Sequence, residues 1–189
     1  YADIASFLGS QLGGLIVKDA VTNQVQARLD FVRQAIGVDP LKDLASVTLY
    51  GDAYGDKSGV AVVRGTFASD KVETFLKAAE GYEIVAYGNR NIHKWNDKIH
   101  NRPGYVSFAS PGVAVVGGDV DKVKAGLDVL DGRKPCLGAA SNLKADSIGA
   151  GFLAVSALKA DSGGIGGQAH ASVLQNANWM TLSAGETAG

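Results

Sequence analysis

The sequence contains very little sulfur. Cysteine and methionine occur once each among 189 residues, as Cys136 and Met180. A single cysteine excludes an internal disulfide and any zinc or iron–sulfur site built from several cysteines, and it leaves the redox compartment open. Because Met180 is the sole methionine, Tyr1 does not correspond to a start codon. We therefore expect that a signal peptide has been removed.

The sequence also lacks an excess of either charge and any long hydrophobic run. Lysine plus arginine number 18 and aspartate plus glutamate 19, so the net charge is −1. There is no basic block that could follow a phosphate backbone, and we expect no nucleic-acid partner. Apolar stretches such as residues 12–17 and 149–155 are far shorter than the ~20 residues of a membrane-spanning helix, so no transmembrane segment is expected.

Motifs of known catalytic mechanisms are absent as well. No serine occupies the Gly-x-Ser-x-Gly turn of hydrolases, and the glycine-rich run at residues 163–167 lacks the Lys-Ser/Thr of a phosphate-binding loop. We therefore expect no catalytic residue and no cofactor, and the balance of these observations is against an enzyme.

The sequence does contain a repeat. The pentapeptide GVAVV occurs at residues 59–63 and again at residues 112–116, 53 positions later. Each copy follows a strand-like run and precedes a helical pattern that begins with Asp-Lys-Val, at residues 70–72 and 121–123. The identical strand and the matching helix together indicate duplicated β–β–α units.

These patterns, with a helical spacing of apolar residues before the repeat, divide the chain into three regions. The predicted regions are an N-terminal helical segment at 1–45, a duplicated β–β–α domain at 46–135 (units 46–81 and 104–132 with an inserted hairpin at 82–97), and the start of a further, incomplete α/β unit at 136–189. The predicted fold class is α+β, with N-terminal helices followed by an antiparallel sheet that carries the helices on one face.

The last region indicates an unpaired strand. Residues 179–189, WMTLSAGETAG, are similar to residues 47–59, a first strand and its turn, but no second strand follows. An unpaired strand exposes backbone N–H and C=O groups that attract another strand. We expect that the polypeptide continues beyond Gly189 or that another chain covers this edge, with Trp179, Thr181 and Ser183 as interface residues.

Two alternative sites remain open. His93, Asp97 and His100 are close in the sequence and could bind a metal or serve a hydrolase, although their spacing is irregular. The favoured interpretation of His93 is a packed cross-strand neighbour of Ile84 and Tyr82 in the hairpin, with one hydrogen bond. A small apolar ligand could also bind between sheet and helices near Trp95, in a closed apolar pocket.

Several stretches resemble a family of uncharacterised exported bacterial proteins. They are SVTLYGDAYGDKSGVAVVRGTF, DKVETFLKAAEGYE, IHKWND and KAGLDVLDGRKP, and the resemblance spans roughly residues 38–189. It implies a periplasmic or extracellular location and a chain that continues past Gly189, and it brings no catalytic residue. The expected function is therefore a non-catalytic exported structural or binding module that assembles through exposed strand edges with itself or another exported protein.

Overall fold

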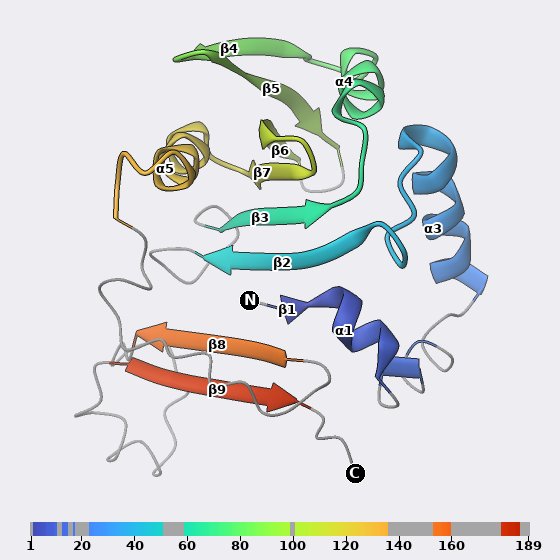
Figure 1. Ribbon diagram of the computed structural model, residues 1–189. Helices are drawn as coiled ribbons and strands as arrows, with labels where there is room; N and C mark the ends of the chain where they lie inside the picture. The colour runs from blue at the N-terminus through green and yellow to red at the C-terminus, as the bar shows by residue number, and fades with distance from the viewer. Residues whose placement is uncertain are drawn as a thin grey trace.

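The computed structural model describes residues 2–10, 13–14, 17, 23–50, 59–98, 101–135, 153–159 and 179–185. Its described strands form one antiparallel sheet of nine strands, in the order β4-β5-β6-β7-β3-β2-β1-β8-β9 (Figure 1). Four described helices accompany the sheet. The predicted α+β class is therefore confirmed.

The elements follow one another along the chain in this order. They are β1 (Ala2–Asp3), α1 (Ile4–Gly9), α3 (Asn23–Ile36), β2 (Leu44–Tyr50), β3 (Val60–Gly65), α4 (Ser69–Lys77), β4 (Glu83–Tyr87), β5 (Arg90–Asp97), β6 (Arg102–Ser110), β7 (Val113–Gly117), α5 (Val120–Leu130), β8 (Leu153–Lys159) and β9 (Trp179–Gly185). A strand–strand–helix order thus occurs twice, as β2-β3-α4 and as β6-β7-α5. Whether the two segments share an origin stays a prediction.

The two GVAVV pentapeptides lie side by side in the sheet. β3 pairs with β7 in antiparallel register, and Val62 of the first copy is opposite Val115 of the second. Both side chains are buried. Since Val62 and Val115 hold the same position in the two pentapeptides, the repeated segments meet about a local two-fold axis.

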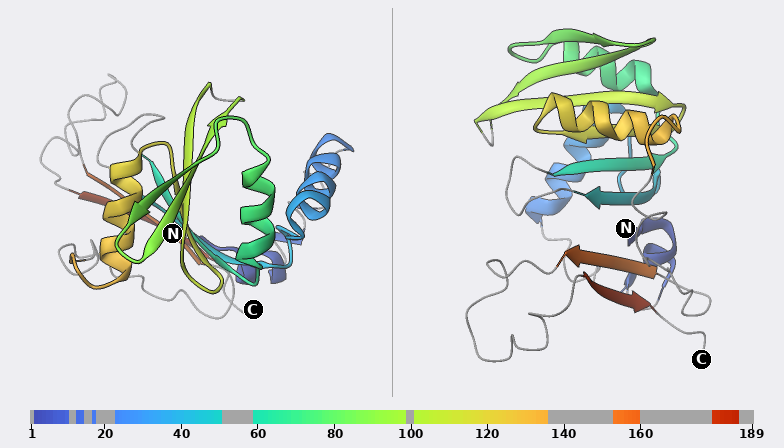
Figure 2. Two further views of the ribbon diagram at one scale, coloured as in Figure 1. Left: turned by 90° about the horizontal axis from the view of Figure 1, so that it is seen from above. Right: turned by 90° about the vertical axis from the view of Figure 1, so that its left-hand side faces the viewer.

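The two repeated helices cover opposite faces of the sheet, and the prediction of helices on one face is wrong. On β7, Val115 packs with Val123 and Leu127 of α5. The preceding residue, Ala114, faces the other side of the sheet and packs with Leu76 of α4. Figure 2 shows α4 and α5 on either side of the twisted strands. The physical reason is that GVAVV is apolar on both faces, so both need a cover.

The N-terminal segment contributes a strand as well as helices. β1 occupies the sheet between β2 and β8, with Ala2 opposite both Val47 and Ala154, and Asp3 accepts a hydrogen bond from the backbone N–H of Ser6 to cap α1. This strand was not expected in a region predicted to be helical. On α3, Val25 of the predicted apolar stripe is 39% exposed. The stripe therefore does not mark a fully buried face.

The last two described strands form an antiparallel pair. β8 and β9 match over their full length, from Leu153 opposite Gly185 to Lys159 opposite Trp179. β9, which the sequence suggested was a first strand without a partner, therefore has one in β8. Among the described strands, β1 links this pair to the rest of the sheet, with Ala2 opposite Ala154 in the register between β1 and β8.

Candidate functional site

His93 lies on β5 in the core below α4. It is 2% exposed, its Nδ1 is 2.9 Å from the Tyr82 hydroxyl, and its ring stacks on the Tyr82 ring. Glu73 Oε1 on α4 lies 3.8 Å from Nε2. Burial lowers the pKa of His93, and the negative charge of Glu73 offsets only part of this decrease. Such a histidine is a packed core residue with one hydrogen bond, and it is opposite Ile84 in the register, as the structural alternative expected.

Of the other two residues of the predicted metal set, only Asp97 is described. Asp97 ends β5, where it is opposite Arg102, and His100 lies outside the described residues. Within the part of the chain that the structure describes, no three His, Cys, Asp or Glu side chains come together as a metal site would require. The metal or hydrolase alternative thus rests on the sequence alone.

Trp95 packs against the backbone of the neighbouring strand. A methyl group added at Gly104 would overlap the Trp95 ring, so the strands β5 and β6 come close at this point. One hollow lined by described residues lies between α3 and α4, and another lies between α1 and the adjoining ends of β2 and β3. Trp95 lines neither of these two. The predicted apolar ligand pocket near Trp95 remains a sequence-based hypothesis.

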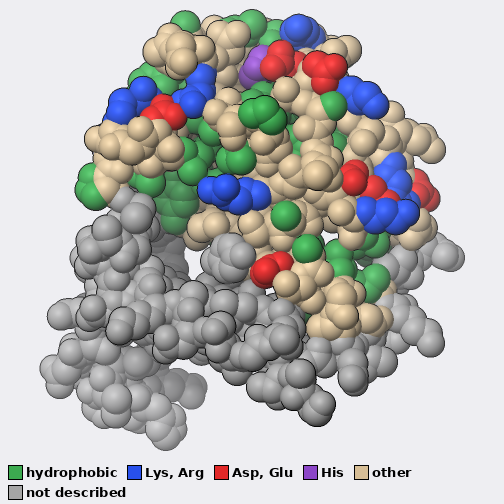
Figure 3. Space-filling model, in the orientation of Figure 1, with side chains coloured by type: hydrophobic (Ala, Val, Ile, Leu, Met, Phe, Trp, Pro, Cys, Tyr) green, Lys and Arg blue, Asp and Glu red, His purple; other side chains and the backbone are tan. Residues whose placement is uncertain are grey.

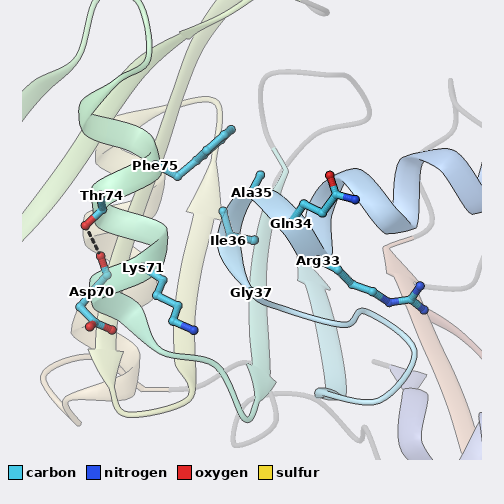
Figure 4. A pocket seen from close by; sticks show the side chains of 9 residues that line it. All are labelled: Arg33, Gln34, Ala35, Ile36, Gly37, Asp70, Lys71, Thr74 and Phe75. Atoms are coloured by element: carbon cyan, nitrogen blue, oxygen red, sulfur yellow. Dashed lines mark hydrogen bonds between the residues drawn. The ribbon is translucent and has the colours of Figure 1, made fainter.

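The hollow between α3 and α4 has a volume of about 470 Å³ (Figure 4). Lys71 extends from α4 along the end of α3, where it would meet a side chain added at Gly37. Arg33 pairs with Asp30 at 2.6 Å and with Asp39 at 3.0 Å. The guanidinium of Arg33 is therefore held in ion pairs that stabilise the fold. The residues that line this hollow do not bring together the groups of a catalytic mechanism.

β9 is the terminal strand at one end of the sheet. It carries the predicted interface residues Trp179, Thr181 and Ser183, which alternate along the strand. Among the described strands its only neighbour is β8. Its other edge therefore has no described partner strand.

β4 is the terminal strand at the other end, and it pairs only with β5 among the described strands (Figure 1). Ile84 is 51% exposed and Ala86 is exposed as well, while Val85 and Tyr87 pack on the α5 side of the sheet. Residues 84–87 contain no charge and no proline, and the register with β5 shows no bulge. Charged residues, proline and bulges usually protect an edge strand from association, and residues 84–87 have none of them.

The outer edge of β4 presents the backbone groups of Ile84 and Ala86. Ala86 is opposite Asn91 on β5, and the Asn91 carbonyl instead accepts a hydrogen bond of 2.8 Å from Ser107 Oγ on β6. Because hydrogen-bonded and non-bonded pairs alternate in an antiparallel ladder, Ala86 and Ile84 direct their N–H and C=O groups away from β5. No described residue forms a hydrogen bond to these groups.

The two ends of β4 differ in charge. At its C-terminal end the Tyr87 hydroxyl donates to Asp128 Oδ1 at 2.7 Å, and Lys124 and Arg133 lie over the Tyr87 ring at 5.8 and 5.7 Å from its centroid. This hydrogen bond, with ion pairs to Lys134 and Arg133, lowers the pKa of Asp128 to about 2.

At its N-terminal end, β4 carries a carboxylate. Glu83 pairs with Lys94 at 2.9 Å, and its side chain remains 62% exposed. The edge strand therefore has an ion-paired carboxylate at one end and two cationic side chains over its other end.

Sequence reasoning identified the β4–β5 hairpin but not its edge. The hairpin is inserted between the two repeated segments and has no counterpart in the repeat. β5 pairs with β6 of the second strand–strand–helix segment, and β4, on the outer side of β5, is thereby left at the end of the sheet.

Comparison with protein-family models, with curated proteins and with solved structures gives no match to this chain. None of the described helices is long and apolar enough to cross a membrane. On the face shown in Figure 3, cationic and acidic side chains of the described residues are interspersed.

Proposed function

We propose that this chain is a non-catalytic exported structural or binding module that assembles by strand pairing at the ends of its sheet, with itself or with another exported protein. The observation that carries the proposal is the outer edge of β4, where the N–H and C=O groups of Ile84 and Ala86 have no described partner. Export rests on the family resemblance of the sequence.

The chemistry of the edge favours association over protection. β4 has a sequence of high β propensity, EIVAY, and its exposed Ile84 adds apolar area that pairing would remove from water. Backbone hydrogen bonds to an added strand supply affinity, and the alternating side chains supply specificity. The one described histidine is buried, which agrees with a role other than catalysis.

The molar mass of the purified protein in solution tests the proposal. We expect light scattering to show a rise in mass with concentration, and Ala86→Pro to reduce it, because proline removes an outward N–H while the bonds to β5 remain. Ala86→Thr is the matched control, since it keeps the N–H and the β propensity.

The contribution of β9 is tested in the same way. Thr181→Pro and Leu182→Pro alter neighbouring residues, whose N–H groups point to opposite edges of the strand. We expect only one of the two to leave the pairing with β8 intact. A strict monomer at every concentration would overturn self-association, and association insensitive to the prolines in both β4 and β9 would overturn strand pairing.

A further inference from the structure

We infer that β4 pairs with β4 of a second copy of this chain, antiparallel, with Val85 on the two-fold axis. This inference rests on the proposed function and specifies its partner and register. The sheets of the two copies would then continue into one another across a symmetric interface.

The direction of the backbone groups determines the register. The outward-facing residues of β4 are Ile84 and Ala86, so both strands can form hydrogen bonds only where these residues are opposite one another. Pairing Ile84 with Ala86 of the second copy satisfies all the outward groups of Glu83–Tyr87 in both strands. Any shift along the strand leaves some of these groups without a partner.

The side chains agree with this register. On the α4 side of the sheet, Ile84, 51% exposed, would lie beside Ala86 of the second copy, and the same contact recurs across the axis. A large residue is thereby matched with a small one at both positions. On the α5 side, Val85 would meet Val85 of the second copy, continuing an apolar row that already includes Ile92.

The charges favour a second copy over an unrelated strand. In this register Glu83, which is paired with Lys94, lies opposite Tyr87 of the second copy. Over that ring lie Lys124 and Arg133, which are paired with acids of their own chain. The exposed carboxylate thus approaches two cations, and the symmetric contact occurs at the other end of the strand. A parallel pairing would place the two Glu83 carboxylates side by side and away from those cations, which is less favourable.

Disulfide trapping between two single-cysteine variants tests the register. Cys136 is first replaced by serine, and Ile84→Cys and Ala86→Cys are then made in separate chains. In an antiparallel pair, Cα atoms of directly opposite residues are about 5.5 Å or less apart, within the range of a disulfide. We expect a cross-linked dimer from the equimolar mixture under mild oxidation, and little from either variant alone.

The outcomes separate this inference from the proposed function. A cross-link in the mixture alone supports the register. Association of the serine-substituted parent without that cross-link, or equal cross-linking by one variant alone, overturns the inference while strand pairing stands. Absence of any association in the parent overturns both.

Glu83→Gln provides an independent measurement. We expect it to weaken the dimer several-fold at low salt and to reduce the loss of affinity that added salt causes, because the carboxylate no longer faces the two cations. Asp70→Asn, at an exposed position in the first turn of α4, is the control and should leave the dissociation constant unchanged. An equal effect of the two substitutions would contradict the inferred electrostatic contact.

Discussion

The two strand–strand–helix segments have the same order of elements but unequal helices. α5 buries Val123 and Leu127 completely, and Asp119 caps its start by accepting hydrogen bonds from two backbone N–H groups. α4 buries only Leu76, and its N-cap residue is Ala68, which forms no side-chain cap. The helix with the better cap is thus also the helix with the larger core contact.

The position of each helix on the sheet explains the difference. α5 packs over β3, β6 and β7, the central strands, where Val60, Val62 and Val115 form its floor. α4 packs nearer the end of the sheet, against β5 and against α3, where Phe31 and Phe75 are in contact but remain largely exposed. Similar helical patterns therefore give different burial, because the surface beneath them differs.

The largest expected effect is a core truncation on the α5 side. Leu127→Ala should lower the free energy of unfolding by about 3–5 kcal/mol, because it leaves a cavity in a fully enclosed site. Leu76→Ala, on α4, should cost about 2–3 kcal/mol, since the side chain is slightly exposed and its site can collapse more readily. Urea unfolding measures both, and an equal or reversed order would contradict the comparison.

The next effect concerns the closest approach of α5 to the sheet. A methyl group added at Gly126 would overlap the Tyr50 hydroxyl and lie 3.0 Å from Val115 Cγ1. Gly126→Ala should therefore cost about 1–3 kcal/mol, even though alanine favours the helix.

Tyr50→Phe provides the control for this contact. The Tyr50 hydroxyl is buried and has no hydrogen-bond partner among the described residues, so its removal should be neutral or stabilising by up to about 1 kcal/mol. The double variant should be more stable than the sum of the single effects predicts. Strict additivity would show that the hydroxyl does not limit the approach of α5.

A smaller effect is expected at the helix starts. Asp119→Ala should cost about 1 kcal/mol, because the N–H groups of Asp121 and Lys122 lose their acceptor. Ala68→Ser should instead gain a few tenths to about 1 kcal/mol by supplying the cap that α4 lacks. Thermal unfolding of the two variants tests this contrast, which fails if both changes have the same sign.

Local patterns in the sequence predicted much of the fold. The hairpin of β4 and β5 and the helix α5 lie where strand alternation and helical spacing over a few positions predict them. The faces covered by α4 and α5 could not be predicted in this way, because a helix stripe shows that one side is buried but not which face of the sheet it meets. β1 was also missed, since two residues carry no period.

The candidate site divides along the same line. The neighbours of His93 followed from strand alternation, and they exclude it as an accessible group. The free edge of β4 depends on the order of strands in the sheet, in which β5, β6 and β7 separate it from β3. Strand order is set by long-range pairing, which the local sequence of EIVAY does not encode.

The last contrast between the two faces is how the free energy of unfolding responds to acid. Burial lowers the pKa of His93 below its ordinary 6.5, so the unfolded chain binds the proton more readily. Stability on the α4 side is present above about pH 6.5 and falls as the pH drops below it. Urea unfolding as a function of pH should show this decline, and His93→Gln should remove it.

On the α5 side the decline begins at lower pH. The pKa of Asp128 falls from 3.8 to about 2 through the hydrogen bond from Tyr87 and the ion pairs with Lys134 and Arg133. Its contribution is therefore retained above about pH 4 and lost between about pH 4 and 2. Asp128→Asn should lower stability at pH 7 and flatten the pH dependence in this range, while leaving the decline near pH 6 unchanged. Asp128→Asn should not alter the decline near pH 6, and His93→Gln should not alter the decline between about pH 4 and 2. If either did, the two faces would not titrate independently. The α4 side and the α5 side of the core would then not be separate in energetic terms.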